Sequence, residues 1–374
     1  MKTYQKSFSA TSDFSSMDLD FEPGIILLFI SPSFPKIESF IKTVSENYPN
    51  STITGCSTSG EIFDTEVNDS TIVFNALKFE KTKHRLSSID IADFENSLDA
   101  GAKLSQNLES AELRHILVFS DGLKVNGADL VKGLTEELEE TVSITGGLAA
   151  DGTDFNKTFT IINGQICEGK VIGIGLYGPA LKIGYSSKGG WDSFGMERIV
   201  THSKNNVLFE LDGEPALDLY KSFLGEKAAE LPSSGLLFPL SMRTDSNSKP
   251  VVRTILAVDE KEKSLTFAGS IPKGSSVRLM KANVDRLING AEDSAKNCLE
   301  VLEEEADFAL LISCVGRRLV LRQMVEEEVE AVRDVLGKKP VISGFYSYGE
   351  LAPFGKFEPC LLHNQTMTIT TFSE

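Results

Sequence analysis

The chain has 374 residues, and 41% of them are hydrophobic, which is enough to fill the cores of two or three domains. Its 37 lysines and arginines are outnumbered by 54 aspartates and glutamates, so the formal net charge is −17, and such an acidic surface repels a nucleic-acid backbone. No stretch approaches the ~20 apolar residues that span a bilayer, and the polar N-terminus lacks the apolar core of a secretion signal, so we expect a cytoplasmic protein without a membrane anchor.

The first half of the chain predicts two units in which strands and helices alternate. Residues 1–23 form an arm, and the continuous apolar run at residues 25–30 fits a strand that is buried on both faces. Apolar residues then recur at three- and four-residue spacing up to Tyr48, which predicts a helix. Further strands and helices are predicted over residues 71–79, 83–91, 95–108, 115–120, 157–162 and 170–177.

The pattern changes near Gly189-Gly190-Trp191. Short strands meander between residues 236 and 280, and two long helices then enclose a buried strand at residues 308–314. We place a boundary at about residue 200, which divides residues 24–200 from residues 201–374. The sequence therefore predicts a mixed α/β fold of two related domains, in which helices cover β-sheets and repeated strand–helix–strand units end in glycine loops.

One sequence frame recurs three times, each time after an apolar strand. Two glycines five residues apart are followed by a glutamate in residues 55–61 and again in residues 344–350. A looser copy at residues 146–152 has Asp151 at the place of the second glycine. Glycine permits backbone angles and close approaches that a Cβ forbids, so these frames indicate tight loops around a cavity. Three ordinary strand-exit turns would give the same pattern.

Side chains near these loops are suited to hold a small charged ligand. Arg317 follows a buried strand and would bind a ligand carboxylate through two parallel hydrogen bonds, unless it pairs with Glu61 or Glu350. Glu61 or Glu350 would bind a ligand amine, while Tyr346 and Tyr348 would supply an apolar wall with hydroxyl groups. The expected ligand-binding residues are Gly55, Cys56, Ser57, Thr58, Glu61, Asp151, Cys314, Arg317, Tyr346, Tyr348, Glu350, His363 and Asn364.

The cysteines and histidines leave one catalytic alternative. Five scattered cysteines without C-x-x-C spacing fit a reducing compartment and argue against a disulfide framework or a structural zinc site. Cys314 lies where a strand passes into a helix, and it is either an acyl-transfer nucleophile with His363 as its base or a small residue that fills a strand end. The four histidines include no helix-borne metal pair, and the G-x-G-x-x-G at residues 173–178 is followed by a strand, so neither a metal nor a dinucleotide site is predicted.

Several of these motifs together resemble the FIST family of sensory proteins, with an N-terminal and a C-terminal FIST domain in that order. The matching segments are residues 54–61, 146–149, 211–216, 313–317, 344–350 and 362–366. These segments run from residue 54 to residue 366, and the resemblance extends from about residue 24 to residue 373, so it covers nearly the whole chain. It implies a bacterial-type intracellular signal sensor that binds a small ligand, with amino acids or related metabolites proposed for the family.

The resemblance also sets expectations for partners and cofactors. FIST domains are often fused to histidine kinases or other output modules, whereas few residues follow the second domain here. We therefore expect a stand-alone sensor without a cofactor, which binds rather than catalyses and signals to a separate partner such as a histidine kinase. A haem-binding gas sensor, with His202 or His363 as the axial ligand, is one alternative, and an enzyme that uses Cys314 is the other.

Overall fold

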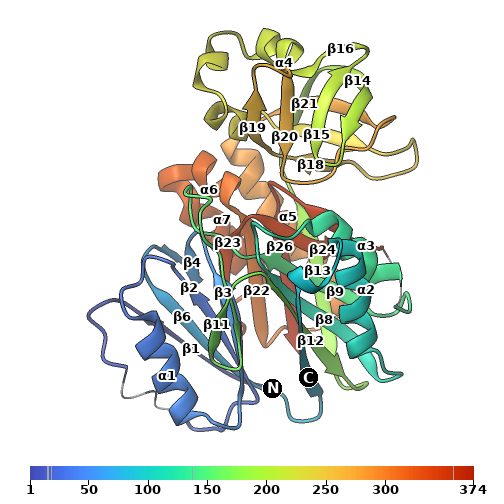
Figure 1. The fold of residues 1–374 in the computed structure, drawn as a ribbon. Coiled ribbons are helices and arrows are strands. Elements are labelled where there is room, and N and C mark those ends of the chain that lie inside the picture. Colours follow the sequence, from blue (N-terminus) through green and yellow to red (C-terminus); the bar gives the residue numbers. More distant parts are fainter. Residues whose placement is uncertain (15–16, 18, 137, 357) are drawn as a thin grey trace.

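The computed structural model describes residues 1–14, 17, 19–136, 138–356 and 358–374. A body built from three six-stranded sheets carries a smaller lobe, formed by residues 192–281, at one end (Figure 1). The chain enters the lobe through residues 189–191 and returns through residues 282–283. Mixed sheets covered by helices confirm the predicted α/β class. No helix in these ranges is both long enough and apolar enough to cross a membrane.

The body contains three copies of one unit. In each copy two parallel strands are joined through a helical segment, and a later strand lies antiparallel to the first of the two. The first unit consists of β2 (Ile25–Ile30), α1 (Ile37–Asn47), β3 (Thr52–Ser57) and β6 (Ile72–Lys78). The second consists of β8 (Leu113–Ser120), α3 (Gly127–Glu136), β9 (Ser143–Leu148) and β12 (Lys170–Tyr177). The third consists of β22 (Phe308–Cys314), α6 (Val315–Leu321), α7 (Val325–Leu336), β23 (Val341–Ser347) and β26 (Met367–Ser373).

Short hairpins interlock these three units. The hairpin that follows each unit's second parallel strand pairs with the sheet of a different unit. The hairpins are β4 (Glu61–Phe63) with β5 (Glu66–Asn68), β10 (Thr160–Ile162) with β11 (Gln165–Cys167), and β24 (Gly349–Pro353) with β25 (Cys360–His363). They extend the sheets of the third, first and second unit respectively. The exchange is cyclic, so no unit completes its own sheet.

The remaining elements of the body close its edges and faces. They are the outer strands β1 (Lys2–Phe8), β7 (Lys83–Asp90) and β13 (Lys182–Lys188), the helices α2 (Ser97–Leu108) and α5 (Val284–Leu302), and the 3₁₀ helices η1 (Ile91–Asp93) and η4 (Arg322–Met324). α2 packs against α3, and α5 packs against α7 and β13. Between the sheets, the rings of Phe29, Phe119 and Phe345 meet with centroids 4.9 to 6.1 Å apart. This aromatic cluster is part of the core that holds the three units together.

The close spacing of paired strands explains the first glycine of each repeated frame. A Cβ at Gly55, Gly146 or Gly344 would lie 1.9, 2.0 or 1.8 Å, respectively, from a carbonyl oxygen of the neighbouring parallel strand. Carbon and oxygen cannot approach so closely, so only glycine allows β3, β9 and β23 to lie where they do. These glycines therefore belong to the strands and not to the loops in which the sequence suggested them.

The lobe has its own antiparallel sheet and its own core. Its strands are β14 (Asp192–Lys204), β15 (Val207–Leu211), β16 (Glu214–Pro215), β17 (Leu240–Arg243), β18 (Val251–Arg253), β19 (Ile255–Asp259), β20 (Ser264–Phe267) and β21 (Ser276–Lys281). Its helices are α4 (Ala216–Leu224), η2 (Gly225–Glu230) and η3 (Ser233–Leu237). Leu217 and Tyr220 of α4 pack with Leu265 and Phe267 in this core. The predicted boundary near residue 200 falls inside β14, and the chain beyond the lobe completes the third unit of the body.

Candidate functional site

The loops after β3, β9 and β23 meet one another instead of surrounding a cavity. The amide of Ser59 donates to the carbonyl of Tyr346 at 2.8 Å, and the amide of Tyr346 donates to the carbonyl of Gly60 at 2.9 Å. The third loop joins them, because the amide of Ala150 donates to the carbonyl of Ser57 at 2.9 Å. Residues 55–60 and 344–350 are buried throughout. The expectation that each loop presents its side chains to a cavity is therefore wrong for most of these side chains.

Glu61 and Glu350 occupy equivalent positions and tie their loops to the sheets. Glu61 accepts hydrogen bonds from the Thr58 hydroxyl and from the Thr71 amide and hydroxyl, the last two at 3.2 and 2.7 Å. Glu350 accepts from the Ser347 hydroxyl at 2.6 Å and from the Thr366 amide and hydroxyl at 3.3 and 3.0 Å.

Both carboxyl groups are fully buried, and desolvation raises the pKa of Glu61 to about 7 and that of Glu350 to about 8. Since their oxygens already have partners and no solvent reaches them, the expected role in binding a ligand amine has no support in this geometry. Their hydrogen bonds stabilise two equivalent loops inside the body.

Asp151 and Tyr348 close the loop after β9. One oxygen of Asp151 accepts from the amides of Asn156 and Lys157 at 2.8 and 2.6 Å, and the other accepts from the Tyr348 hydroxyl. The Tyr348 ring is stacked on Phe155 with centroids 4.6 Å apart. Burial and the bond to Asp151 raise the pKa of Tyr348, so its hydroxyl stays protonated and acts as a donor. These two residues therefore join the second and third loops.

Arg317 is enclosed in the body and unavailable to a ligand. Its guanidinium donates to Glu328 at 3.0 and 2.6 Å and to the backbone carbonyls of Leu287, at 2.8 Å, and Gly189. Glu328 also accepts from the Tyr346 hydroxyl at 2.6 Å. All of these side chains are fully buried. The proposed carboxylate-binding role of Arg317 is therefore corrected to a structural one, and the partner is Glu328 rather than Glu61 or Glu350.

The sulfur and imidazole groups do not form a reactive site. Cys314 is buried, and desolvation raises the pKa of its thiol well above the usual range, which disfavours a thiolate. Cys56 is likewise buried with a raised thiol pKa. The Nε2 atom of His363 lies 2.8 Å from the Ala352 carbonyl, and burial lowers the pKa of this imidazole to about 4. A haem iron needs an accessible imidazole nitrogen, so His363 does not fit the axial role.

The other predicted residues are placed apart from one another. The Ser57 hydroxyl accepts from the Phe159 amide at 3.1 Å, and His202 lies on the surface of the lobe, where it stacks on Phe209. Asn364 is fully buried, with neither polar atom of its side chain hydrogen-bonded. Within the described ranges, no three His, Cys, Asp or Glu side chains are grouped so that they could hold a metal ion.

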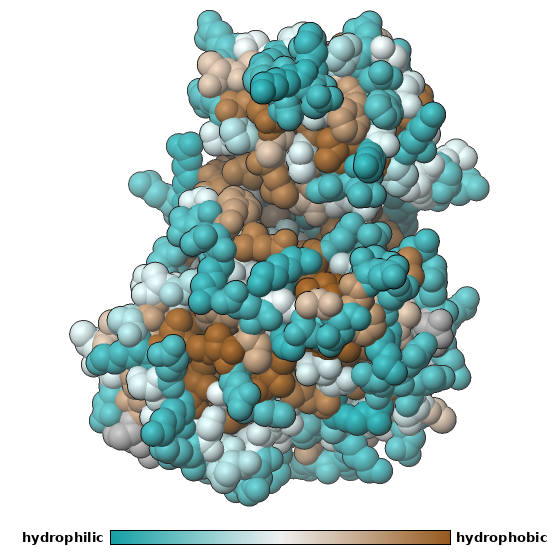
Figure 2. Space-filling model, viewed as in Figure 1, coloured by the Kyte–Doolittle hydropathy of each residue, from teal (hydrophilic) through white to brown (hydrophobic). Residues whose placement is uncertain are grey.

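An open cleft lies where the ends of these loops face the lobe. Its volume is about 690 Å³, and apolar side chains are exposed in the recess between lobe and body (Figure 2). The lining residues are Ser59, Asp69, Gly152, Thr153, Glu230, Ser233, Ser234, Leu236, Leu237, Val315, Arg318, Leu319, Arg322 and Val325. We call this space the junction cleft. None of the predicted ligand-binding residues lines it, although several of their immediate neighbours in the chain do.

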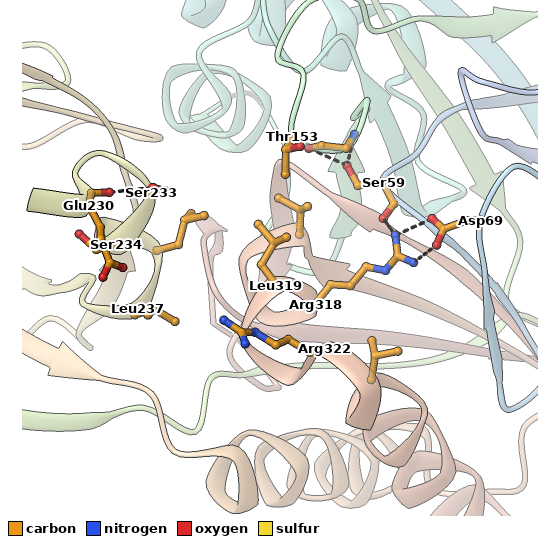
Figure 3. Close-up of a pocket in the computed structure, with 14 residues that line it drawn as sticks. Ser59, Asp69, Thr153, Glu230, Ser233, Ser234, Leu237, Arg318, Leu319 and Arg322 are labelled. Atoms are coloured by element: carbon orange, nitrogen blue, oxygen red, sulfur yellow. Dashed lines mark hydrogen bonds and ion pairs between the residues drawn. The ribbon is translucent and has the colours of Figure 1, made fainter. Parts of the chain in front are cut away.

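Two arginines line the junction cleft. Arg318 donates to Asp69 at 2.8 and 2.6 Å and to the Ser59 carbonyl at 2.6 Å, so its donors are largely engaged (Figure 3). Arg322 is exposed, and its side chain makes no hydrogen bond or ion pair with any described residue. Figure 3 shows its side chain extending toward the lobe, where Glu230 lies. Sequence reasoning missed both, although both lie within five residues of Arg317 in the chain.

Comparison with known proteins agrees with the motifs. The FIST N domain matches residues 24–214, and the FIST C domain matches residues 216–353. The uncharacterized protein MJ1623 of Methanocaldococcus jannaschii is 26% identical over 230 residues, which are 58% of this chain and 43% of that protein, so the match spans less than half of its length. A solved structure of cyanuric acid hydrolase from A. caulinodans aligns at 11% identity over 78% of this chain and 99% of that one, with a TM-score of 0.18. Because the two domains cover most of the chain in the expected order, the chain belongs to the FIST family, whose domains are associated with signal-transduction sensing.

Proposed function

We propose that this protein is a sensor that binds a small ligand in the junction cleft and signals through the position of its lobe. The ligand class that fits is an amino acid or a related metabolite with a free carboxylate. The observation that carries the proposal is Arg322, a guanidinium in the cleft whose donors have no partner among the described residues. A carboxylate would meet this group through two charge-assisted hydrogen bonds.

The walls of the junction cleft suit a small amphipathic molecule. A volume of about 690 Å³ lies within the usual range for small-molecule sites. Leu236 and Leu237 of the lobe face Val315 and Leu319 of the body across the space, and these would contact an apolar side chain. Glu230 pairs with Lys227 at an exposed position, at 3.0 Å, so it can exchange that partner for a ligand amine at little cost.

The position of the cleft gives binding a structural consequence. One wall belongs to the lobe and the other to the body, so a ligand that touches both stabilises one position of the lobe over others. The chain crosses between the two parts at residues 189–191 and 282–283, and side chains such as Arg253, which donates to the Leu362 carbonyl at 3.1 Å, also bridge them. A separate signalling protein, such as a histidine kinase, would recognise the ligand-bound position.

A thermal-shift screen of the twenty amino acids and of small organic acids tests this function, because a ligand that binds only the native state raises Tm. We expect at least one compound to stabilise the wild type and Arg322→Gln to lose most of that shift. A charge-assisted hydrogen bond contributes about 1.5–3 kcal/mol, so the affinity should fall by roughly tenfold or more.

Lys42→Gln is the matched control, since it also removes one positive charge but lies on the exposed face of α1, away from the lobe (Figure 1). It should respond like the wild type. If no compound shifts Tm, or if Arg322→Gln responds as strongly as the wild type, the proposed site is wrong.

A further inference from the structure

A second cleft lies on the other flank of the lobe–body junction. Its volume is about 610 Å³, and it is formed by α3, by the β17–β18 region of the lobe and by the segment around β25. α3 and α6 lie on opposite sides of the junction in Figure 1, so this space is separate from the junction cleft. We call it the α3 cleft.

Arg253, at the end of β18, is the unusual residue of the α3 cleft. Its side chain is only 5% exposed, yet it forms no ion pair with any described carboxylate. Its Nε donates to the Ser270 carbonyl at 3.2 Å, and its Nη1 donates to the carbonyls of Val252 and Leu362, each at 3.1 Å. Its Nη2 has no hydrogen-bond partner among the described residues. Neutral carbonyls thus hold the guanidinium in place and leave its charge without a counter-ion among the residues that the structure describes.

A buried cation without a counter-ion is unfavourable unless something else compensates for its lost hydration. Burial lowers the pKa of Arg253 to about 10, which still leaves the group charged at neutral pH. The contrast with Arg317 is direct, because that buried arginine has Glu328 as its counter-ion at 2.6 Å. A bound anion would act as the counter-ion of Arg253, as Glu328 does for Arg317.

The fold positions this guanidinium with little freedom. A Cβ at Gly269 would lie 3.0 Å from Nε and 3.2 Å from Cζ of Arg253, so the absence of a side chain there leaves room for the group. At such a separation an added Cβ would have to displace the planar guanidinium. The group is therefore fixed before any ligand arrives, which lowers the entropic cost of binding.

The other walls of the α3 cleft are mostly apolar. They include Val131, Met242, Val251, Phe354, Leu361 and Leu362. Two lysines also line the space: Lys249 pairs with Glu358 at 2.5 Å and lies over the Phe354 ring, and Lys132 pairs with Glu136 at 3.7 Å. An inorganic anion would leave the apolar walls uncovered, and a neutral apolar molecule would leave Arg253 without a counter-ion.

We propose that the α3 cleft is a second binding site, which takes a small apolar monocarboxylate whose carboxylate bonds to Arg253. Its aliphatic or aromatic part lies against Val251, Phe354 and Leu361. The ligand class differs from that of the junction cleft, because the anion meets a buried guanidinium. Among the described residues that line the α3 cleft, the one carboxylate, Glu358, is paired with Lys249 and is not free to receive an amine. This site does not depend on the proposed function of the junction cleft.

Phenylacetate and hexanoate are suitable probes, with phenylacetamide and inorganic phosphate as controls, and isothermal titration on the full chain gives the affinity. Both carboxylates should bind the wild type, and the amide and phosphate should bind at least tenfold more weakly. Arg253→Met should reduce carboxylate affinity by at least tenfold, whereas Lys42→Gln, on the exposed face of α1, should leave it unchanged.

Arg253→Met also removes three hydrogen bonds to backbone carbonyls, so a second variant guards against loss of folding. Thr135→Trp keeps Arg253 and fills the cleft from its half-buried position on α3, and it should also weaken binding at least tenfold. The proposal is overturned if the wild type does not bind the carboxylates, if the amide or phosphate binds equally well, or if Thr135→Trp binds them as tightly as the wild type.

Discussion

Arg317 and Glu328 form a buried ion pair beside the two chain segments that connect lobe and body. The guanidinium also holds the carbonyl of Gly189, at the first crossing, and that of Leu287, in the first turns of α5 after the second crossing. Arg317, which the sequence motif marked as a ligand-binding residue, therefore has a structural role. The pair fixes where both crossings leave the body.

Removal of one partner of this pair leaves the other charge buried without compensation, which typically costs about 3–5 kcal/mol. We therefore expect Glu328→Gln to lower the free energy of unfolding by several kcal/mol in a urea titration. Asp64→Asn breaks the partly exposed pair with Arg333 and should cost less than about 1 kcal/mol. Equal effects of the two substitutions would show that the buried pair contributes no more to the free energy of unfolding than the partly exposed pair.

The buried carboxyls Glu61 and Glu350 should make stability depend on pH. Their pKa values rise from 4.5 to about 7 and about 8 on folding, so the folded protein binds more protons than the unfolded chain between pH 4.5 and pH 8. Stability therefore falls as pH rises through this window. The buried imidazoles of His115 and His363 have lowered pKa values, about 3 and about 4, so their contribution changes only below about pH 6.5.

A comparison of pH 6.5 with pH 8.5 therefore reports mainly on the glutamates, and a glutamate variant that keeps every histidine cancels the remaining histidine contribution. Glu350→Gln has no carboxyl group that can ionise at this position. Between pH 6.5 and pH 8.5 its free energy of unfolding, measured by urea denaturation, should therefore fall by about 1–2 kcal/mol less than that of the wild type. Glu46→Gln, on the exposed face of α1, should follow the wild type. A Glu350→Gln profile parallel to that of the wild type would mean that this carboxyl is ionised in the folded protein at both pH values.

At the scale of elements, the repeated glycine frame is predictable from the sequence, and the hairpin exchange is not. Spacing in the chain reveals three similar strand-to-loop segments, but the pairing of residues 61–63 with residues 343–345 depends on tertiary geometry. The sequence also draws attention to Arg317 in the segment at residues 313–317, yet it does not show which face of the short helix α6 is buried. Function was therefore expected at Arg317, while Arg318 and Arg322 are the residues that reach the junction cleft.

Glycines of the repeated frame should tolerate no side chain. A Cβ at Gly344 would lie 1.8 Å from the carbonyl oxygen of Leu311, which belongs to a buried strand and cannot move aside cheaply. We expect Gly344→Ala to cost on the order of 3 kcal/mol or more in unfolding free energy. Gly355→Ala is the control, because the nearest atom to its Cβ would be 3.8 Å away. A Gly344→Ala protein as stable as the control would contradict the close strand packing.

At the scale of the whole molecule, a three-unit body carries one lobe, and a cleft lies on each flank of their junction. The formal charge of −17 works against anionic ligands at long range, so binding must come from local cations. Arg322 in the junction cleft and Arg253 in the α3 cleft are such cations, and neither has a carboxylate partner among the described residues. A ligand in either cleft would restrain the lobe against the body.

Hydrogen exchange, measured with and without the amino acid or organic acid that stabilises the protein most, tests the central claim most directly. We predict slower amide exchange on both walls of the junction cleft, in residues 230–237 of the lobe and 315–325 of the body, and no such change in Arg322→Gln. Protection on only one wall, or protection that persists in Arg322→Gln, would contradict a sensor that reads its ligand through this cleft.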